Sequence, residues 1–150
     1  MQIALIAALV IGAPLPSLEV TSLAGEPTAV AAKHGRPLVI DLFATWCGPC
    51  RESLPVLERL RQRFGDRVDF VSISEDDDGK KVAAFVADLK LGSRVVLDAR
   101  RRAYERLGAH RLPTTYIVDG NGVVYKINHG YGGGYEERMT TWLQALLSRP

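Results

Sequence analysis

The feature that most constrains this chain is a carboxylate inside an apolar run, followed closely by the chain's only two cysteines. Residues 39–57 read VIDLFATWCGPCRESLPVL, with Asp41 surrounded by apolar side chains and with Cys47 and Cys50 separated by Gly and Pro. The β-branched, apolar residues 37–44 have the length of a strand and are bounded by a proline and by the Gly-Pro pair. They predict a buried strand that carries Asp41 and leads directly into the cysteines.

Helical and strand patterns alternate along the rest of the chain. From Cys50 to Phe64 the apolar residues recur at intervals of three and four, which predicts a helix that ends at Gly65. Strands are expected at residues 68–75 and 94–99, helices at residues 80–91 (closed by Gly92), 101–109 and 135–147, and hairpins at residues 12–36 and 112–130. This order predicts an α/β fold with a mixed central β-sheet flanked by helices on both faces and a short N-terminal hairpin extension.

Length and charge narrow the class of protein. A chain of 150 residues suits one domain with its own core, which we expect to span residues 12–150. The formal net charge is only +2, without a dense basic stripe, so the sequence argues against a nucleic-acid partner. A disulfide between two cysteines three positions apart closes a very small loop and therefore constrains the unfolded chain little. This favours redox chemistry over a structural disulfide.

The apolar start of the chain, MQIALIAALVIGA, has three open interpretations. It is only about half as long as a membrane-spanning helix, and no Lys or Arg precedes the apolar run as a secretory signal would require. Residues 1–11 are interpreted as a remnant of a signal or membrane tether, as an N-terminal strand, or as an artefact of the start site.

The spacing of the cysteines fits disulfide exchange. The reaction needs an accessible, acidic thiolate and a second thiol close enough to displace the mixed disulfide. If the helix begins at Cys50, Cys47 lies just before it, where free backbone N–H groups and the helix dipole stabilise a thiolate. We therefore assign Cys47 as the exposed nucleophile and Cys50 as the resolving thiol.

Asp41 is the candidate catalytic base for Cys50. Burial disfavours a carboxylate, so it should raise the pKa of Asp41 and allow the group to take and return a proton near neutral pH. The alternative is that Asp41 only accepts a hydrogen bond from neighbouring main chain.

A second motif, RLPTT at residues 111–115, stands at the start of a strand. Proline cannot donate to a β-ladder, so a proline at this position has a positional purpose. A cis Leu112–Pro113 bond would turn the main-chain groups of Leu112 toward Cys47 and offer an edge for an extended substrate. The residues expected to bind substrate are Trp46, Gly48, Pro49, Leu112, Pro113 and Thr114.

The chain resembles the thioredoxin superfamily, and within it the TlpA-like and ResA-like thiol-disulfide oxidoreductases. The resemblance rests on FATWCGPCRESLPVL, VSISED, RLPTTYIVDGNG and IGAPLPSLEVTSLAGEP, and it covers residues 12–147. It implies the thioredoxin fold, a cis-Pro113, Cys47 as the nucleophile and a kink at Pro55. It also implies an extracytoplasmic, often membrane-tethered enzyme that reduces disulfides of partner proteins, as in cytochrome c maturation.

We expect the partners to be protein disulfide or thiol substrates and an upstream electron-donor thiol protein. No cofactor is required, and the protein is expected to be a monomer. A cytoplasmic location stays open.

Three departures from the family pattern affect this interpretation. Gly48-Pro49 is the pair of general thioredoxins, which widens the expected substrate range and favours a reductant. Ser53 stands where specialised cytochrome-maturation members have a glutamate, and Glu52 would face about 100° away around the helix. The strand at residues 68–75 lacks the lysine that thioredoxins place near the buried acid, so Asp41 should keep its proton to higher pH.

Other functions were weighed against the same residues. A thioredoxin-fold peroxidase would have a threonine three residues before its reactive cysteine, whereas Thr45 is two before Cys47. A redox-silent binding module has no need of the dithiol and the buried acid. A copper-handling module would use His129, while His34, His110 and His129 have no spacing that suggests zinc, so no metal site is expected. The loop GYGGG, residues 130–134, fails the nucleotide fingerprint and is expected to be a flexible loop.

Overall fold

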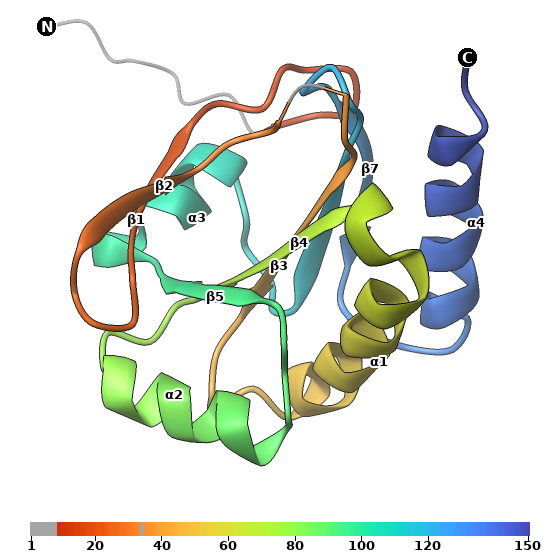
Figure 1. The fold of residues 1–150 in the computed structure, drawn as a ribbon. Coiled ribbons are helices and arrows are strands. Elements are labelled where there is room, and N and C mark those ends of the chain that lie inside the picture. The colour runs from red at the N-terminus through yellow and green to blue at the C-terminus, as the bar shows by residue number, and fades with distance from the viewer. Residues whose placement is uncertain (1–8, 34) are drawn as a thin grey trace, which may run out of the picture.

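The computed structural model describes residues 9–33 and 35–150. Within these residues the chain forms seven strands and four longer helices, and Figure 1 shows how they are arranged. The strands are β1 (Leu18–Thr21), β2 (Pro27–Val30), β3 (Leu38–Phe43), β4 (Asp69–Ser74), β5 (Arg94–Leu97), β6 (Thr114–Val118) and β7 (Val124–His129). The helices are α1 (Gly48–Phe64), α2 (Gly79–Asp88), α3 (Arg102–Leu107) and α4 (Tyr135–Leu147), with short 3₁₀ turns η1 (Gly65–Arg67) and η2 (Ala99–Arg101).

All seven strands form one mixed sheet in the order β2-β1-β5-β4-β3-β6-β7. The central strands β3, β4 and β5 are parallel, while β6 and β7 continue the sheet in antiparallel fashion. At the other edge, β1 and β2 form the N-terminal hairpin, and Thr21 of β1 pairs with Leu97 of β5. The predicted fold class is therefore confirmed, including the hairpin extension.

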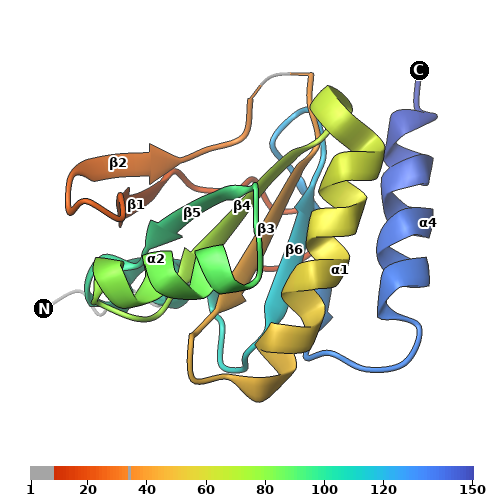
Figure 2. The ribbon, with the colours of Figure 1, turned by 60° about the horizontal axis from the view of Figure 1, so that its bottom comes forward.

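The two faces of β3 carry different side chains, because successive residues of a strand point to opposite faces. Leu38, Ile40 and Leu42 pack in a cluster with α3. Val39 and Phe43 face the other side, where Figure 2 shows α1 and α4 running next to each other. Asp41 lies between them on this second face. It therefore separates the cluster that contains Val39 from the cluster that contains Phe43.

Several helix boundaries differ by one to three residues from the sequence prediction, and two of the differences have a clear cause. Helix α1 begins at Gly48, two residues before Cys50, because Cys47 itself caps it. Helix α2 ends at Asp88, well before Gly92, because the chain turns at Leu89 and Lys90 then adopts a left-handed backbone with φ 55°. Pro55 lies inside α1, where it lacks the amide that would continue the helical ladder, yet the helix runs on to Phe64.

The prediction for residues 1–11 falls mostly outside the described residues. Of the described part, residues 9–13 form a turn in which the Ala13 amide donates to the Val10 carbonyl at 3.1 Å, and Pro14 bridges to Val123. In residues 9–33 and 35–150, no helix has the length and apolar character needed to cross a bilayer.

Candidate active site

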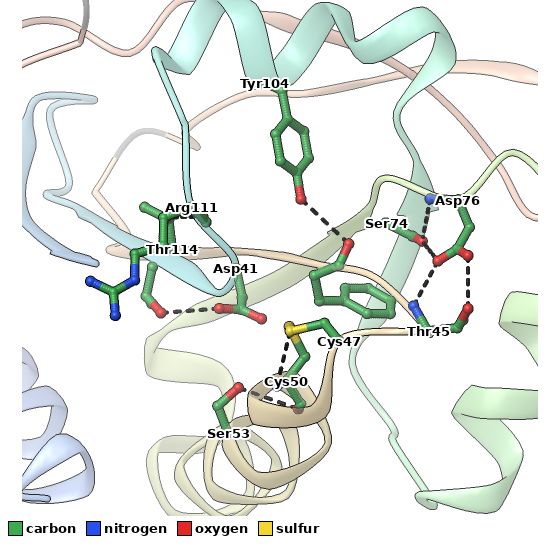
Figure 3. The surroundings of a disulfide bond; sticks show 12 residues. Asp41, Thr45, Cys47, Cys50, Ser53, Ser74, Asp76, Tyr104, Arg111 and Thr114 are labelled. Carbon is green, nitrogen blue, oxygen red and sulfur yellow. Dashed lines mark hydrogen bonds between the residues drawn. A yellow bond between two sulfur atoms is a disulfide. The ribbon is translucent and has the colours of Figure 1, made fainter. Parts of the chain in front are cut away.

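The two cysteines form a disulfide at the N-terminus of α1 (Figure 3). Cys47 is the N-cap residue, with an extended backbone, and its Sγ accepts a hydrogen bond from the Cys50 amide at 3.3 Å. Pro49 stands in the first turn, where a missing amide costs nothing because the first N–H groups of a helix have no intrahelical acceptor. The helix N-terminus is thus directed at the Cys47 sulfur, and this favours the negative charge of a thiolate there.

The two sulfur-bearing residues differ in access, although less than predicted. Cys50 is completely buried, while Cys47 keeps 5% of its surface exposed. The expectation of an exposed Cys47 is therefore wrong for this disulfide form, because the N-cap position turns the side chain back over the helix and into an apolar cluster with Phe43 and Leu54. Its neighbour Trp46 is the exposed group, at 66%.

Cys47 nevertheless borders a surface cleft of about 440 Å³, whereas Cys50 does not. The cleft contains four of the expected substrate-binding residues, Trp46, Gly48, Pro49 and Leu112. Its remaining lining residues are Glu75, Arg101, Tyr104, His110 and Arg111. A partner that enters this cleft meets Cys47 first, which agrees with its assignment as the attacking thiol.

The chain segment before β6 closes one side of the cleft. The Leu112–Pro113 peptide bond is cis, and Thr114 Oγ1 donates to the Arg111 carbonyl at 2.6 Å, which ties the loop together. Among the described residues no hydrogen bond engages the main-chain N–H or C=O of Leu112. Pro113 and Thr114 are buried behind Leu112, so of these three residues Leu112 is the one placed to contact a substrate.

Asp41 lies on β3 behind the disulfide, and Figure 3 shows its carboxyl group directed toward the sulfurs. The residue is 1% exposed. Its Oδ1 accepts a hydrogen bond from Thr115 Oγ1 at 3.0 Å, and its Oδ2 has no partner among the described residues. The alternative of a hydrogen bond to neighbouring main chain is therefore not what the structure shows.

Burial raises the pKa of Asp41 to about 8, although the Thr115 hydrogen bond opposes the shift. The residue that pairs with Asp41 on β4 is Ser72, so the adjacent strand supplies no cation at this position. A carboxyl group that titrates near neutral pH next to a dithiol is suited to exchange protons with it.

The loop between β3 and α1 is held by a carboxylate at the end of β4. Asp76 accepts hydrogen bonds from the Thr45 amide and the Thr45 hydroxyl, both at 2.7 Å, and from Ser74 Oγ at 2.8 Å. Burial opposes its ionisation, but these hydrogen bonds outweigh it and hold the pKa of Asp76 below the ordinary value. The acidic loop after β4 thus fixes the residue two positions before Cys47, a role that we did not predict.

We expect Asp76→Ala to loosen the entry to the dithiol. The change removes the charged carboxylate that accepts three hydrogen bonds from Thr45 and Ser74. It should lower the free energy of unfolding at pH 7 by about 2–4 kcal/mol, measured by urea titration. Asp77→Ala is the matched control, because Asp77 is exposed and forms none of these bonds. Equal stabilities of the two variants would contradict this account of Asp76.

Four other residues that the sequence analysis considered for a functional role lie away from the cysteines or make other contacts: Ser53, Glu52, His110 and His129. Ser53 is buried and its hydroxyl donates to the Cys50 carbonyl at 3.3 Å. Glu52 instead borders a hollow of about 670 Å³ between α1 and the GYGGG loop. The His110 and His129 rings lie 5.5 Å apart, but no three potential metal ligands gather anywhere in the described part of the chain.

Sequence reasoning missed the two hydroxyl groups next to the buried acid. Thr115 stands directly opposite Asp41 in the β3–β6 register, and its hydroxyl is 2.8 Å from that of Tyr135, the first residue of α4. The pairing of the strands could have indicated Thr115. No sequence signal pointed to Tyr135, because its position depends on how the GYGGG loop returns the chain to the sheet.

The mixed sheet has a parallel centre and an antiparallel end, and the two cysteines lie at the start of α1. These features are typical of the thioredoxin superfamily. A family model described as Redoxin matches residues 11–141. The chain belongs to this family, and within the thioredoxin superfamily it is of the TlpA-like and ResA-like kind.

The similar proteins cover most of the chain. Thioredoxin-like protein YneN of Bacillus subtilis is 29% identical over 122 residues, which are 79% of this chain and 71% of that protein. Thiol-disulfide oxidoreductase ResA of Bacillus anthracis is 26% identical over 137 residues, 91% of this chain and 78% of its own. Thiol:disulfide interchange protein DsbE of Haemophilus influenzae is 28% identical over 139 residues, with 91% and 72% covered.

Solved structures share the fold at lower identity. A crystal structure of a secreted Mycobacterium tuberculosis disulfide oxidoreductase superposes with a TM-score of 0.75 at 22% identity, covering 86% of this chain and 96% of that one. A Chlorobium tepidum protein gives a TM-score of 0.86 at 23% identity, with 94% and 100% covered. These likenesses confirm the architecture of the sheet and helices.

Proposed function

We propose that this protein is a thiol-disulfide oxidoreductase that reduces disulfides in other proteins through a Cys47–Cys50 dithiol cycle. The observation that carries the proposal is the disulfide at the start of α1, with Cys47 bordering the cleft and Cys50 buried behind it. The names of the relatives ResA and DsbE support the same reaction class. We propose that residues 12–150 act as the catalytic domain.

The reaction starts from the reduced dithiol. The Cys47 thiolate attacks one sulfur of a substrate disulfide, so a Cys47–substrate disulfide forms and the other substrate sulfur leaves as a thiolate, which takes a proton from water. The Cys50 thiol then loses its proton to Asp41 and attacks Cys47. The Cys47–Cys50 disulfide forms, the second substrate thiol leaves, and the substrate has gained two electrons and two protons. An upstream thiol protein must return these to the enzyme.

The substrates that fit this site are extended segments of proteins. The main chain of Leu112, which forms no hydrogen bond within residues 9–33 and 35–150, offers an edge for such a segment, and Trp46 offers an exposed aromatic surface beside it. Ser53 in place of an acidic residue supports a broad substrate range over a dedicated role in cytochrome c maturation. The relation to ResA and DsbE supports an extracytoplasmic location, and the tether and the monomeric state stay predictions.

The second candidate function is that of a peroxidase. This chain shares its fold with a peroxiredoxin-like protein of Aquifex aeolicus, with a TM-score of 0.74 at 17% identity. Thr45, the only threonine just before Cys47, gives both its amide and its hydroxyl to Asp76. Its hydroxyl is therefore already engaged and does not face Cys47 as a peroxide ligand.

The reduction potential of the dithiol tests the proposed direction. We expect a value near that of thioredoxin, about −270 mV, when the protein is equilibrated with dithiothreitol buffers and its free thiols are counted. Under these conditions the reduced protein should also reduce the interchain disulfides of insulin. A potential near −120 mV would mean that the protein donates its disulfide to substrates, and the assignment as a reductase would be wrong.

A further inference from the structure

A row of polar side chains crosses the sheet on the face that α1 and α4 cover. Ser72 of β4, Asp41 of β3 and Thr115 of β6 are partners in register, so their side chains lie next to one another on that face. Tyr135 extends the row from α4, where the left-handed backbone of Gly134, with φ 80°, lets the helix start beneath the sheet. Asp41, Thr115 and Tyr135 are each at least 99% buried.

The hydroxyl groups in this row have a fixed direction when Asp41 is ionised. A hydroxyl group has one proton to donate and two lone pairs to accept with. Thr115 uses its proton for Asp41 Oδ1, at 3.0 Å, so the 2.8 Å contact with Tyr135 requires the tyrosine hydroxyl to be the donor. Burial raises the pKa of Tyr135 well above its ordinary value, so the donor proton stays in place through the working range of pH.

Few other groups face the carboxyl group. Helix α1 presents the Cys47–Cys50 disulfide, and β4 presents Ser72. Tyr104 of α3 packs on the opposite face of the sheet, where its hydroxyl donates to the Phe43 carbonyl; its pKa is raised by burial and by nearby carboxylates, including Asp41. Around Tyr135 lie Tyr131, at 5.2 Å between ring centroids, and Arg138, whose charge acts on the phenol. The Thr115 hydroxyl is the only direct hydrogen-bond donor to Asp41 within the described residues.

We propose that Thr115 and Tyr135 are positioning residues for Asp41. Their two linked hydroxyl groups hold Asp41 Oδ1 as a hydrogen-bond acceptor and leave Oδ2 as the oxygen that exchanges the proton of Cys50. The unpartnered Oδ2 is the second observation that supports this division of roles, because a buried carboxyl oxygen without a partner needs an explanation. The inference rests on the proposed dithiol function, since it gives the proton of the resolving step a specific acceptor atom.

The proton moves as follows. Oδ2 of the Asp41 carboxylate takes the proton from the Cys50 thiol, and the resulting thiolate attacks the Cys47 sulfur of the mixed disulfide. The Cys47–Cys50 bond forms, the bond from Cys47 to the substrate sulfur breaks, and the departing substrate thiolate takes up the proton that Asp41 received, directly or through water. Thr115 and Tyr135 keep their own protons throughout, and their hydrogen bonds strengthen when Asp41 is charged.

The ionisation of Asp41 can be measured without turnover. In the oxidised full-length protein with ¹³C-labelled aspartate, the Asp41 carboxyl resonance should titrate with a midpoint near 8. Thr115→Val should raise this midpoint by about one to two pH units, because the carboxylate loses its direct donor. Tyr135→Phe should raise it by a smaller amount, about half a unit, and Thr115→Ser should restore the wild-type value.

Tyr116→Phe is the matched control. Tyr116 is as buried as Tyr135 and its hydroxyl donates to the Leu107 carbonyl at 3.1 Å, but it points to the opposite face of β6. The control should leave the Asp41 midpoint unchanged although it also removes one buried hydroxyl. An unchanged midpoint in Thr115→Val, or equal shifts in Tyr135→Phe and Tyr116→Phe, would overturn the proposal.

A kinetic measurement connects the titration to the reaction. A chromogenic aromatic disulfide releases one coloured thiol when Cys47 attacks and a second when Cys50 resolves the adduct, so the two steps separate in stopped flow. The pH midpoint of the second phase should move with the Asp41 midpoint in each variant, and the first phase should not. If the wild type shows no second phase, the dithiol function fails, while the carboxyl titration still decides the roles of Thr115 and Tyr135.

Discussion

Cys50→Ser is expected to turn the enzyme into a stable trap for its own substrates. Cys47 still borders the cleft and attacks a disulfide, but no buried thiol remains to release the adduct. A peptide disulfide added to the reduced variant should leave one peptide chain bound per protein molecule, seen by mass spectrometry without reductant and removed by dithiothreitol. Cys47→Ser should give no adduct, and insulin reduction should fall to the uncatalysed rate in both variants.

The two single variants act as controls for each other, because each leaves one thiol in nearly the same place. If Cys50→Ser continues to reduce insulin catalytically, the resolving role of Cys50 is wrong. If Cys47→Ser forms the adduct instead, the roles of the two cysteines are reversed.

Asp41→Asn is expected to raise the free energy of unfolding and, at the same time, to slow the step in which Cys50 releases the substrate. Burial keeps the pKa of Asp41 near 8 in the folded state, against 3.8 for a free side chain, so between these pH values the folded protein binds one more proton than the unfolded chain. The free energy of unfolding therefore falls as the pH rises through this window, by up to about 1.4 kcal/mol per pH unit. Asparagine cannot ionise, so the variant should lose this slope and gain several kcal/mol over wild type at pH 8.

Urea titrations of the oxidised proteins at pH 5 and pH 8 measure the difference. This range lies above the one in which Asp76 titrates, since the pKa of Asp76 is lowered. Asp77→Asn, an exposed change in the next loop position, should follow wild type at both values. Parallel slopes for wild type and Asp41→Asn would mean that Asp41 is ionised in the folded protein at pH 5. The same variant should also slow the Cys50 step near neutral pH, and an unchanged rate would remove Asp41 from the mechanism.

The parts of the site that could be predicted from the sequence are those encoded by neighbouring residues. The apolar run around Asp41 and the spacing of Cys47 and Cys50 predict a buried acid on a strand, followed by a helix, without knowledge of the fold. The mixed sheet also follows from the order of the elements. These features depend on local periodicity, which a single sequence contains in full.

The parts that escaped prediction depend on packing between distant segments. Thr115 is 74 positions from Asp41 and reaches it only through the β3–β6 register. Asp76 holds Thr45 across 31 positions, and the low exposure of Cys47 comes from the apolar cluster around it. The start of α1 at Gly48 was also missed, because a cysteine side chain is not a usual helix cap.

The carboxyl group of Asp41 lies between two apolar clusters, one under α1 and α4 and the other under α1 and α2. For protein engineering this means that heat resistance and activity are opposed at one position. A library of variants selected only for survival at high temperature would be enriched in neutral or apolar replacements of Asp41, because each removes the cost of a buried acid. Such a selection would yield well-folded proteins that form mixed disulfides and release them slowly. A screen for robust versions of this enzyme therefore has to include turnover from its first round.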